Sequence, residues 1–371
     1  MLEIILNNIF SFIVIISLIV FVHEFGHYFI ARLCKVKIEI FSIGFGKEIF
    51  GFNDKSGTRW KFCLIPMGGY VKMFGDRNAA SMPDLSLSQS MSVEEKKQSF
   101  IYKNVYQRLA IVSAGPIANF ILTIIIFTII FRINGLNQTL PIINEIVPNS
   151  AAFDAQLLKS DKIIAINGEK ISQFSDIQKT ILENDNDNFS FVISRKVNGK
   201  EELLEINLKS KIEERENIFK EKVKTRFIGI IATETFHKEL NLVQSFLEAN
   251  KEFYQLSKSI LKGLNQLITG KRSIEELSGP IKIAKYSGET FRQGLLMVLW
   301  FSALISINLG IINLLPLPTL DGGHILFYFF EIILGKPLPQ KFQQSAFFIG
   351  FTLILSLMLL TLYNDINGLL K

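Results

Sequence analysis

Four apolar stretches, each about 20 residues long, stand out along the chain. They run from about Ile9 to Arg32, from Leu109 to Phe131, from Gly294 to Leu317 and from Phe342 to Leu362. Because about 20 apolar residues in a helix suffice to cross the hydrocarbon of a bilayer, the pattern predicts a multi-pass α-helical membrane protein with four transmembrane helices.

Polar segments with other patterns follow the first apolar stretch. Residues 36–40 and 60–64 alternate apolar and polar side chains on either side of a turn cluster at 53–57. This pattern predicts a β-hairpin or small sheet at the cytoplasmic face of the membrane. The next stretch, about 78–97, is rich in Ser, Gln, Asp and Lys, which predicts a mobile loop.

The polar region between the second and third apolar stretches is long enough to fold on its own. Strand-like runs at 162–168, 188–194 and 202–208, with a helical piece at 175–183, predict a small inserted α+β domain. Beyond it, apolar residues recur at helical spacing over about 240–267, which predicts an amphipathic helix at the membrane surface. Its apolar stripe consists of Phe246, Phe253, Leu256, Ile260 and Leu264.

These elements divide the chain into eight expected segments. They are a transmembrane helix at 1–35, a membrane-associated β-hairpin or sheet at 36–75, a cytoplasmic loop at 76–105, a second transmembrane helix at 106–133, the inserted domain at 140–232, an amphipathic helical segment at 236–290, a third transmembrane helix at 292–334 and a fourth at 342–363. The first stretch has no basic residues before it and no small-residue cleavage site after it, so we expect a retained helix rather than a signal peptide.

Composition and charge agree with a membrane protein and indicate its orientation. Apolar residues make up 49% of the chain, the mean hydropathy is +0.31 and the formal net charge is +6. Lys and Arg gather between the first two apolar stretches, which predicts a cytoplasmic loop there, with both termini and the inserted domain on the other side. No basic motif is interleaved with aromatic residues, so the charge indicates topology and anionic headgroups rather than nucleic-acid binding. Cys34 and Cys63 both fall on the cytoplasmic side or at the membrane face, so no disulfide framework is expected.

The sharpest chemical signal is an H-E-x-x-H motif, His23-Glu24-Phe25-Gly26-His27, inside the first apolar stretch. Residues four apart share one face of a helix, so both imidazoles can bind one metal ion while Glu24 lies beside its water. Zinc lowers the pKa of such a water to about 7, and a carboxylate can then take the proton. A Glu and two His facing lipid would be costly, so we expect a hydrolytic centre with one Zn²⁺ per chain.

A tetrahedral catalytic zinc needs a third protein ligand. Asp321 is the strongest intramembrane candidate, because it lies in Asn313-Leu-Leu-Pro-Leu-Pro-Thr-Leu-Asp-Gly-Gly323, where Pro316 and Pro318 interrupt the third helix. Irregular backbone at membrane depth is tolerated where it lines a cavity, so this segment is expected to border the site.

Three other titratable residues have weaker context. His324 is a rival third ligand, although a capped or interfacial histidine is the simpler interpretation. Glu331 is expected at the rim of the site and His237 at the protein surface.

Three motifs in this order resemble those of the site-2 protease family of intramembrane zinc metalloproteases (M50-type). They are His23-Glu-Phe-Gly-His27, Gly115-Pro-Ile-Ala-Asn119 and Asn313-Leu-Leu-Pro-Leu-Pro-Thr-Leu-Asp-Gly-Gly323. Gly68-Gly-Tyr-Val-Lys-Met73 and Ser278-Gly-Pro280 are similar to motifs of the bacterial RseP-type members. The resemblance covers nearly the whole chain.

This resemblance implies a role for each motif residue. It implies that His23, His27 and Asp321 bind the zinc and that Glu24 is the general base. It also implies a set that binds substrate or the oxyanion, namely Asn119, Asn308, Asn313, Pro316, Pro318 and Gly69. From the residues alone, Gly115 and Pro116 could equally pack and kink a helix interface, and Asn119 could be structural or functional.

Residues 149–168 resemble a PDZ domain of the bacterial protease-associated kind, and the available length fits one such domain. Gln156 and Ser160 stand where glycine is common in these domains, a departure within the peptide-binding loop. The resemblance implies that this domain either binds a peptide end or filters substrates by size.

The resemblance implies a protease of a bacterial inner membrane, and with the charge pattern it places the active site toward the cytoplasm and the PDZ-like domain outside it. The resemblance suggests single-span, pre-trimmed membrane-protein substrates such as anti-sigma factors or signal-peptide remnants, held as an unwound strand against an edge of the hairpin. A zinc transporter or channel is an alternative, against which the lack of an inverted repeat argues. An inactive scaffold is another, against which the intact Glu24 and Asp321 argue.

Overall fold

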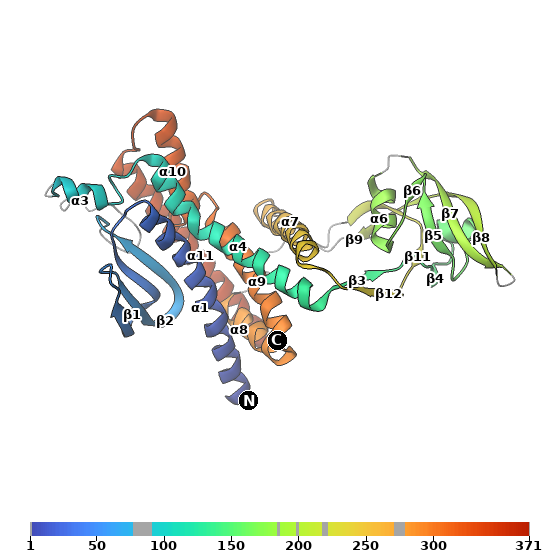
Figure 1. Cartoon of the computed structure of the whole chain (residues 1–371), viewed down its shortest axis with the longest axis horizontal. Helices are drawn as coiled ribbons and strands as arrows, with labels where there is room; N and C mark the ends of the chain where they lie inside the picture. Colours follow the sequence, from blue (N-terminus) through green and yellow to red (C-terminus); the bar gives the residue numbers. More distant parts are fainter. Residues whose placement is uncertain are drawn as a thin grey trace. The chain divides into compact units, whose positions relative to one another are not determined.

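The computed structural model describes residues 2–76, 91–183, 186–197, 200–216, 222–270 and 279–370. Its contacts divide the chain into two units, one formed by residues 1–130 and 244–371 and the other by residues 131–243. The first unit carries the apolar helices, and the second carries the polar region between the second and third apolar stretches (Figure 1).

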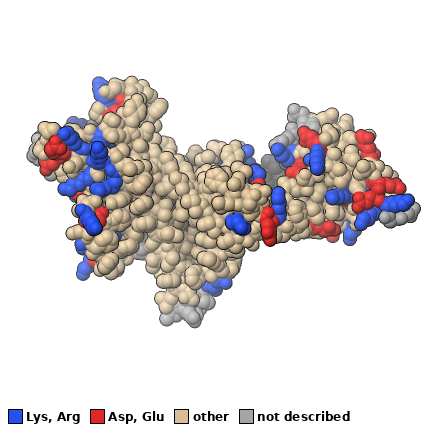
Figure 2. All heavy atoms as spheres, in the orientation of Figure 1, with Lys and Arg blue, Asp and Glu red and all other residues tan. Residues whose placement is uncertain are grey.

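Four of the described helices are long and apolar enough to cross a membrane. They are α1 (Leu2–Leu33), α4 (Val105–Asn134), α9 (Leu295–Asn313) and α11 (Gln340–Leu370). On the face shown in Figure 2, the middle of the first unit is almost free of Lys, Arg, Asp and Glu side chains. The prediction of four apolar helices in a membrane protein is therefore confirmed.

The third apolar stretch is broken by its own sequence. α9 ends before Pro316 and Pro318, which lack the N–H donors that a continuous helix requires. The next helix, α10 (Asp321–Leu334), begins with Gly322 and Gly323 packed so closely on the carbonyls of the preceding turn that a Cβ would overlap them. The segment that the two prolines were predicted to interrupt is thus two helices joined by a tight, irregular turn.

A β-hairpin follows α1 at the position that the alternating pattern predicts. Its strands, β1 (Ile38–Asn53) and β2 (Arg59–Met73), both bend, so that Ile43 lies opposite Phe62 and also opposite Gly69. Because of the bends, residues 40–43 of β1 pair with the start of β2 on one side and with the end of β2 on the other. In the described part of the chain, the end of β2 pairs with β1 only and is an edge of the sheet.

Asp54 organises the turn of this hairpin. Its carboxylate accepts hydrogen bonds from the amides of Ser56 (2.8 Å) and Thr58 (2.9 Å), the Trp60 indole (3.0 Å) and the Tyr28 hydroxyl of α1 (3.3 Å). Burial alone would raise the pKa of Asp54, but these hydrogen bonds outweigh burial and hold the pKa below its usual value. The turn is therefore bonded to both the second strand and α1.

The stretch predicted as a mobile loop at about 78–97 is helical in its last part. Residues 77–90 lie outside the described residues, whereas α3 (Val93–Gln98) is a helix. The Ser92 hydroxyl accepts the Glu95 amide N–H, and the Glu95 carboxylate accepts the Ser92 amide N–H. This capping box stabilises a short polar helix that has no apolar periodicity to reveal it, so the loop prediction was wrong there.

The segment predicted at 236–290 contains two described amphipathic helices, α7 (Leu242–Ile268) and α8 (Pro280–Gln293). Residues 271–278, including Ser278 of the predicted motif, lie outside the described residues. In the apolar stripe of α7, Phe246 is half exposed and the other four residues are partly buried. The α11 carboxylate of Asp365 accepts backbone N–H groups of residues 279, 281 and 282, and so caps α8.

The second unit is a small α+β domain. Its elements in chain order are β3 (Leu136–Thr139), β4 (Glu145–Ile146), α5 (Ala151–Asp154), β5 (Lys162–Ile166), β6 (Glu169–Lys170), α6 (Phe174–Glu183), β7 (Asn188–Val197), β8 (Lys200–Lys209), β9 (Lys211–Glu216), β10 (Lys222–Phe227), β11 (Ile230–Ile231) and β12 (Thr235–Lys238). The main sheet has the order β6-β5-β7-β8, and Phe189, Phe191 and Ile163 lie in its core. Pairing of β3 with β12 brings together the ends at which the chain enters and leaves the unit.

Candidate metal centre

Two histidines of α1 form one side of the candidate site. His23 and His27 are buried and lie one helical turn apart, with their Nε2 atoms 3.3 Å from each other. On the other side of each ring, His27 Nδ1 lies 2.9 Å from the Ile111 carbonyl and His23 Nδ1 lies 3.2 Å from the Asn119 amide. Because each Nδ1 has a partner on α4, both rings present Nε2 to the same point.

Asp321 completes the cluster from the first turn of α10. Its Oδ2 lies 3.2 Å from Nε2 of His23 and 3.5 Å from Nε2 of His27. The same oxygen is buried, and it accepts no hydrogen bond from the described residues. The three side chains thus offer ligand atoms that lie within 4.8 Å of one another.

Gly115 of α4 makes room for both imidazoles. A Cβ at this position would lie 2.6 Å from Cε1 of His27 and 2.8 Å from Cε1 of His23, well inside ordinary van der Waals contact. Gly26 of α1 faces the same helix, where a Cβ would lie 2.8 Å from that of Ala118. The glycines therefore let α1 and α4 approach closely at the level of the histidines.

Glu24 lies between the histidines and the hairpin. Its side chain is buried, and a Cβ at Gly69 would lie 2.9 Å from its Cγ. The cluster opens into a cavity of about 580 Å³. The cavity is lined by the cluster and Glu24, by Gly68, Gly69, Tyr70, Val71 and Met73 of the hairpin and by Phe347, Phe351 and Ile354 of α11, among others. The cavity thus combines the metal-ligand cluster and Glu24 with a largely apolar lining.

The other predicted substrate-binding residues are placed differently from one another. The Asn313 amide lies 3.3 Å from His23 Nε2, next to the cluster. Pro318 packs against α11, where a Cβ at Gly350 would lie 3.1 Å from its Cδ. Pro316 is exposed and Asn308 is partly buried, and the structure places neither among the cavity-lining residues.

The three residues with weaker context also have defined places. His324 lines the cavity but is not one of the three converging ligands. Glu331 forms an ion pair with Arg108 at 2.6 Å, and His237 is an exposed residue of the second unit.

The donor set fits one zinc ion. Two imidazole nitrogens and a carboxylate oxygen are ligand types that zinc takes, and three protein ligands are typical of a catalytic rather than a structural site. The buried Asp321 oxygen without a hydrogen bond and the space left by Gly115 are both consistent with an ion among these atoms. Together with the adjacent Glu24, they define the metal centre of a hydrolase built on apolar helices.

Comparison with known sequences gives the family. Residues 11–357 match peptidase family M50, so the chain belongs to this family and is a zinc metalloprotease. It is 39% identical to "Putative zinc metalloprotease Atu1380" of Agrobacterium fabrum, over 98% of this chain and 96% of that protein. It is 40% identical to "Putative zinc metalloprotease RC0203" of Rickettsia conorii (98% and 99%) and 33% identical to "Metalloprotease MmpA" of Caulobacter vibrioides (96% and 94%).

Sequence reasoning missed two contributions to the site. The Ile111 carbonyl is a backbone group, and a backbone group carries no residue-type signal. The α11 side chains that line the cavity, such as Phe351, belong to a uniformly apolar helix, in which no pattern distinguishes a cavity wall from a lipid-facing surface.

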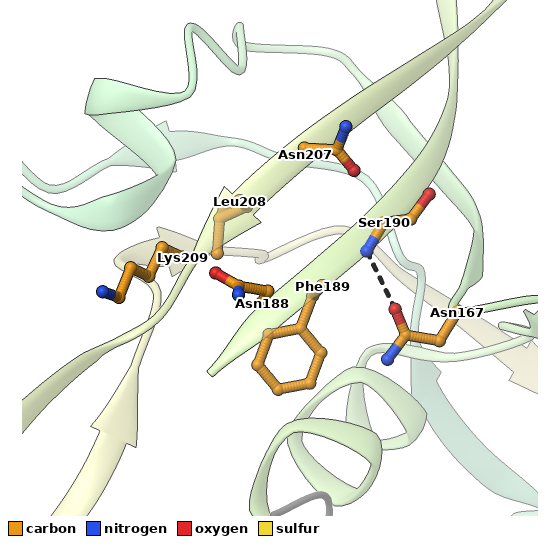
Figure 3. Close-up of a pocket in the computed structure, with 7 residues that line it drawn as sticks. All are labelled: Asn167, Asn188, Phe189, Ser190, Asn207, Leu208 and Lys209. Carbon is orange, nitrogen blue, oxygen red and sulfur yellow. Dashed lines mark hydrogen bonds between the residues drawn. The ribbon is translucent and has the colours of Figure 1, made fainter. Parts of the chain in front are cut away.

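A second cavity, of about 520 Å³, lies on the sheet of the second unit (Figure 3). Its lining consists of Asn167, Asn188, Phe189, Ser190, Asn207, Leu208 and Lys209. Asn167 Oδ1 accepts the Ser190 amide N–H at 2.8 Å. This lining contains amides and one amine but no histidine, cysteine or carboxylate, so it offers neither a metal-ligand set nor an acid–base pair.

Proposed function

We propose that this chain is an intramembrane protease that hydrolyses peptide bonds in or near the transmembrane segments of other membrane proteins. One observation carries the proposal: Glu24 and the cluster of His23, His27 and Asp321 share a cavity among helices apolar enough to span a membrane. Hydrolysis inside a bilayer requires polar groups and water that are shielded from lipid, and such a cavity meets that requirement.

The residues divide the work of hydrolysis. His23, His27 and Asp321 would hold one zinc ion, which supplies Lewis-acid chemistry by polarising a peptide carbonyl and making water more acidic. The Glu24 carboxylate takes a proton from the attacking water and delivers it to the nitrogen of the leaving amine. Glu24 is buried and lines the same cavity as the cluster, so its carboxylate lies where it can exchange a proton with a water held there.

Asn119 would act as a positioning residue for His23. Binding of a metal through Nε2 requires the proton of the imidazole to be on Nδ1, where it needs an acceptor. The Ile111 carbonyl is that acceptor for His27. The Asn119 Oδ1 is buried and accepts no hydrogen bond from the described residues, and a 180° rotation of the amide would bring it to Nδ1 of His23.

The cavity edge of the hairpin is the proposed binding site for an unwound substrate strand. Among the described residues, 69–73 have a paired strand on one side only, namely residues 38–43 of β1. Residues 68–71 line the cavity beside Glu24. An added strand would bond to this free edge and so offset part of the cost of unwinding a helix. Phe62 and Leu64, which lie earlier in β2, are not in the cavity lining, and Phe62 pairs with β1 on both sides.

The proposed setting is a bacterial inner membrane with the active site toward the cytoplasm. Lys and Arg side chains of the first unit gather at the end that carries α3 and the hairpin, in accord with a cytoplasmic face there (Figure 2). The proposed substrates are single-span proteins that have already lost their bulky extracytoplasmic parts, such as anti-sigma factors or signal-peptide remnants.

The second unit is proposed to be a PDZ-like domain that binds a peptide end or filters substrates by size. Gln156 and Ser160 replace glycines that are common in such domains, yet their φ angles are +55° and +73°. Both residues therefore adopt the left-handed backbone that glycine favours, which supports a loop of the PDZ type.

The test is cleavage of a single-span model substrate by the purified protein in liposomes. Glu24→Gln removes the proposed base without touching the ligands, so cleavage should be lost while the variant binds one zinc per chain. Chelation should abolish cleavage by the wild type, and added zinc should restore it. Wild-type zinc binding without cleavage of any trimmed substrate would contradict the proposal in favour of transport or scaffolding.

A further inference from the structure

An ion pair links α4 to α10 away from the metal cluster. Arg108 lies in the first turn of α4, and its Nη2 is 2.6 Å from Oε1 of Glu331 near the end of α10. The two side chains are only 15% and 16% exposed. The guanidinium also donates from Nε to the Lys103 carbonyl (3.1 Å) and lies 4.8 Å from the centre of the buried Tyr328 ring. We call Arg108, Tyr328 and Glu331 the clasp.

The clasp and the metal cluster are on the same helix faces. On α4, residues spaced by three or four carry the contacts, namely Arg108 to α10, Ile111 to His27, Gly115 to both histidines and Asn119 to His23. On α10, Tyr328 comes seven residues (two turns) after Asp321 and Glu331 three residues after Tyr328, with Asp321 at one end of the helix and Glu331 toward the other. Residues at such spacing lie on one side of a helix. The clasp therefore sets the position of α10 along the length of α4.

The main chain does not enter or leave α10 as a continuous helix. It is separated from α9 by the irregular turn with Pro316 and Pro318, and it ends at Gly335 in the left-handed conformation. Neither junction continues a helix, so the rotation and position of α10 also depend on its side-chain contacts with neighbouring helices. Zinc–ligand distances tolerate changes of only about 0.2 Å, so a small slide or rotation of α10 would remove Asp321 from the cluster.

We propose that Arg108 and Glu331 are positioning residues for Asp321, because their ion pair sets the register of α10 against α4 and so places the third zinc ligand. The inference rests on the proposed function of the cluster as a zinc site. It assigns no contact with substrate to either residue.

The experiment measures zinc affinity of the full-length protein in detergent by competition with a chromophoric chelator. Glu331→Gln keeps the shape of the side chain and removes its charge, and the double variant Arg108→Glu with Glu331→Arg restores a pair of opposite sign. Asp161→Asn is the matched control, because it removes an Arg–carboxylate pair of the same 2.6 Å separation in the second unit. The melting temperature of each zinc-free protein shows whether a variant is folded.

We expect Glu331→Gln to weaken zinc binding about 10- to 100-fold, the effect typical of groups that orient metal ligands, without lowering the zinc-free melting temperature by more than the control does. The double variant should recover most of the affinity, and Asp161→Asn should bind zinc as the wild type does. Unchanged affinity in Glu331→Gln, or a loss that the double variant fails to reverse, would overturn the inference. Absence of zinc binding by the wild type would instead defeat the proposed function.

Discussion

Replacing Gly115 with alanine tests the geometry of the metal centre at its tightest point. The added Cβ would lie 2.6 Å from Cε1 of His27 and 2.8 Å from Cε1 of His23, whereas carbon atoms in ordinary contact lie about 3.5–4.0 Å apart. Both rings would therefore have to retreat by about 1 Å. This displacement is several times the roughly 0.2 Å that zinc–ligand distances tolerate.

The effect of Gly115→Ala on folding should be small, because two terms oppose each other. Alanine is favoured over glycine inside a helix by about 0.5–1 kcal/mol. If His27 rotates away, it loses the hydrogen bond to the Ile111 carbonyl, worth about 1 kcal/mol. We expect a near-unchanged melting temperature of the zinc-free protein but a loss of zinc affinity of at least about 100-fold, or roughly 2.7 kcal/mol.

The assay compares zinc affinity, melting temperature and cleavage of a single-span substrate for Gly115→Ala and for Ile117→Ala. Ile117 is on the same helix but is 49% exposed, so its truncation controls for a change in α4 that does not touch the histidines. Zinc affinity of Gly115→Ala within about threefold of the wild type, with cleavage retained, would refute the proposed placement of the ion.

Two further predictions concern the hairpin. Successive residues of an edge strand point their N–H groups to opposite sides, so either Tyr70→Pro or Val71→Pro removes a donor that faces the cavity. The variant that removes this donor should lose cleavage while keeping its zinc. Equal cleavage by both folded variants would contradict strand addition. Asp54→Ala removes the acceptor of four hydrogen bonds and should loosen the turn, which Trp60 fluorescence in a Trp300→Phe background would report. The pKa of Asp54 is lowered in the folded protein, so its contribution to the stability of the turn is full above the ordinary aspartate pKa of about 3.9. That contribution is lost as the pH falls through the folded pKa. A Trp60 signal that resists acid equally with and without Asp54 would contradict this role.

Much of the architecture and chemistry could be predicted from the sequence. The four apolar stretches specify helices by length alone, because a membrane requires every backbone group to be bonded within the segment. His23, Glu24 and His27 could be recognised as one site because the helix itself brings positions four apart to one face. The match of residues 11–357 to peptidase family M50 agrees with the enzyme class that these residues predict, a zinc metalloprotease.

The rest depended on which surfaces meet in three dimensions. Asp321 and the histidines of α1 are far apart in sequence, and only the packing of α10 against α1 and α4 brings Asp321 Oδ2 to 3.2 Å from His23. Likewise, the role of the Ile111 carbonyl and the choice of Gly68–Val71 as the cavity edge follow from contacts between elements. Periodicity shows which face of an element is apolar, but it does not show which partner covers that face. The hydrophobic effect depends on the apolar area removed from water and is not directional, so any apolar surface of suitable shape could cover it.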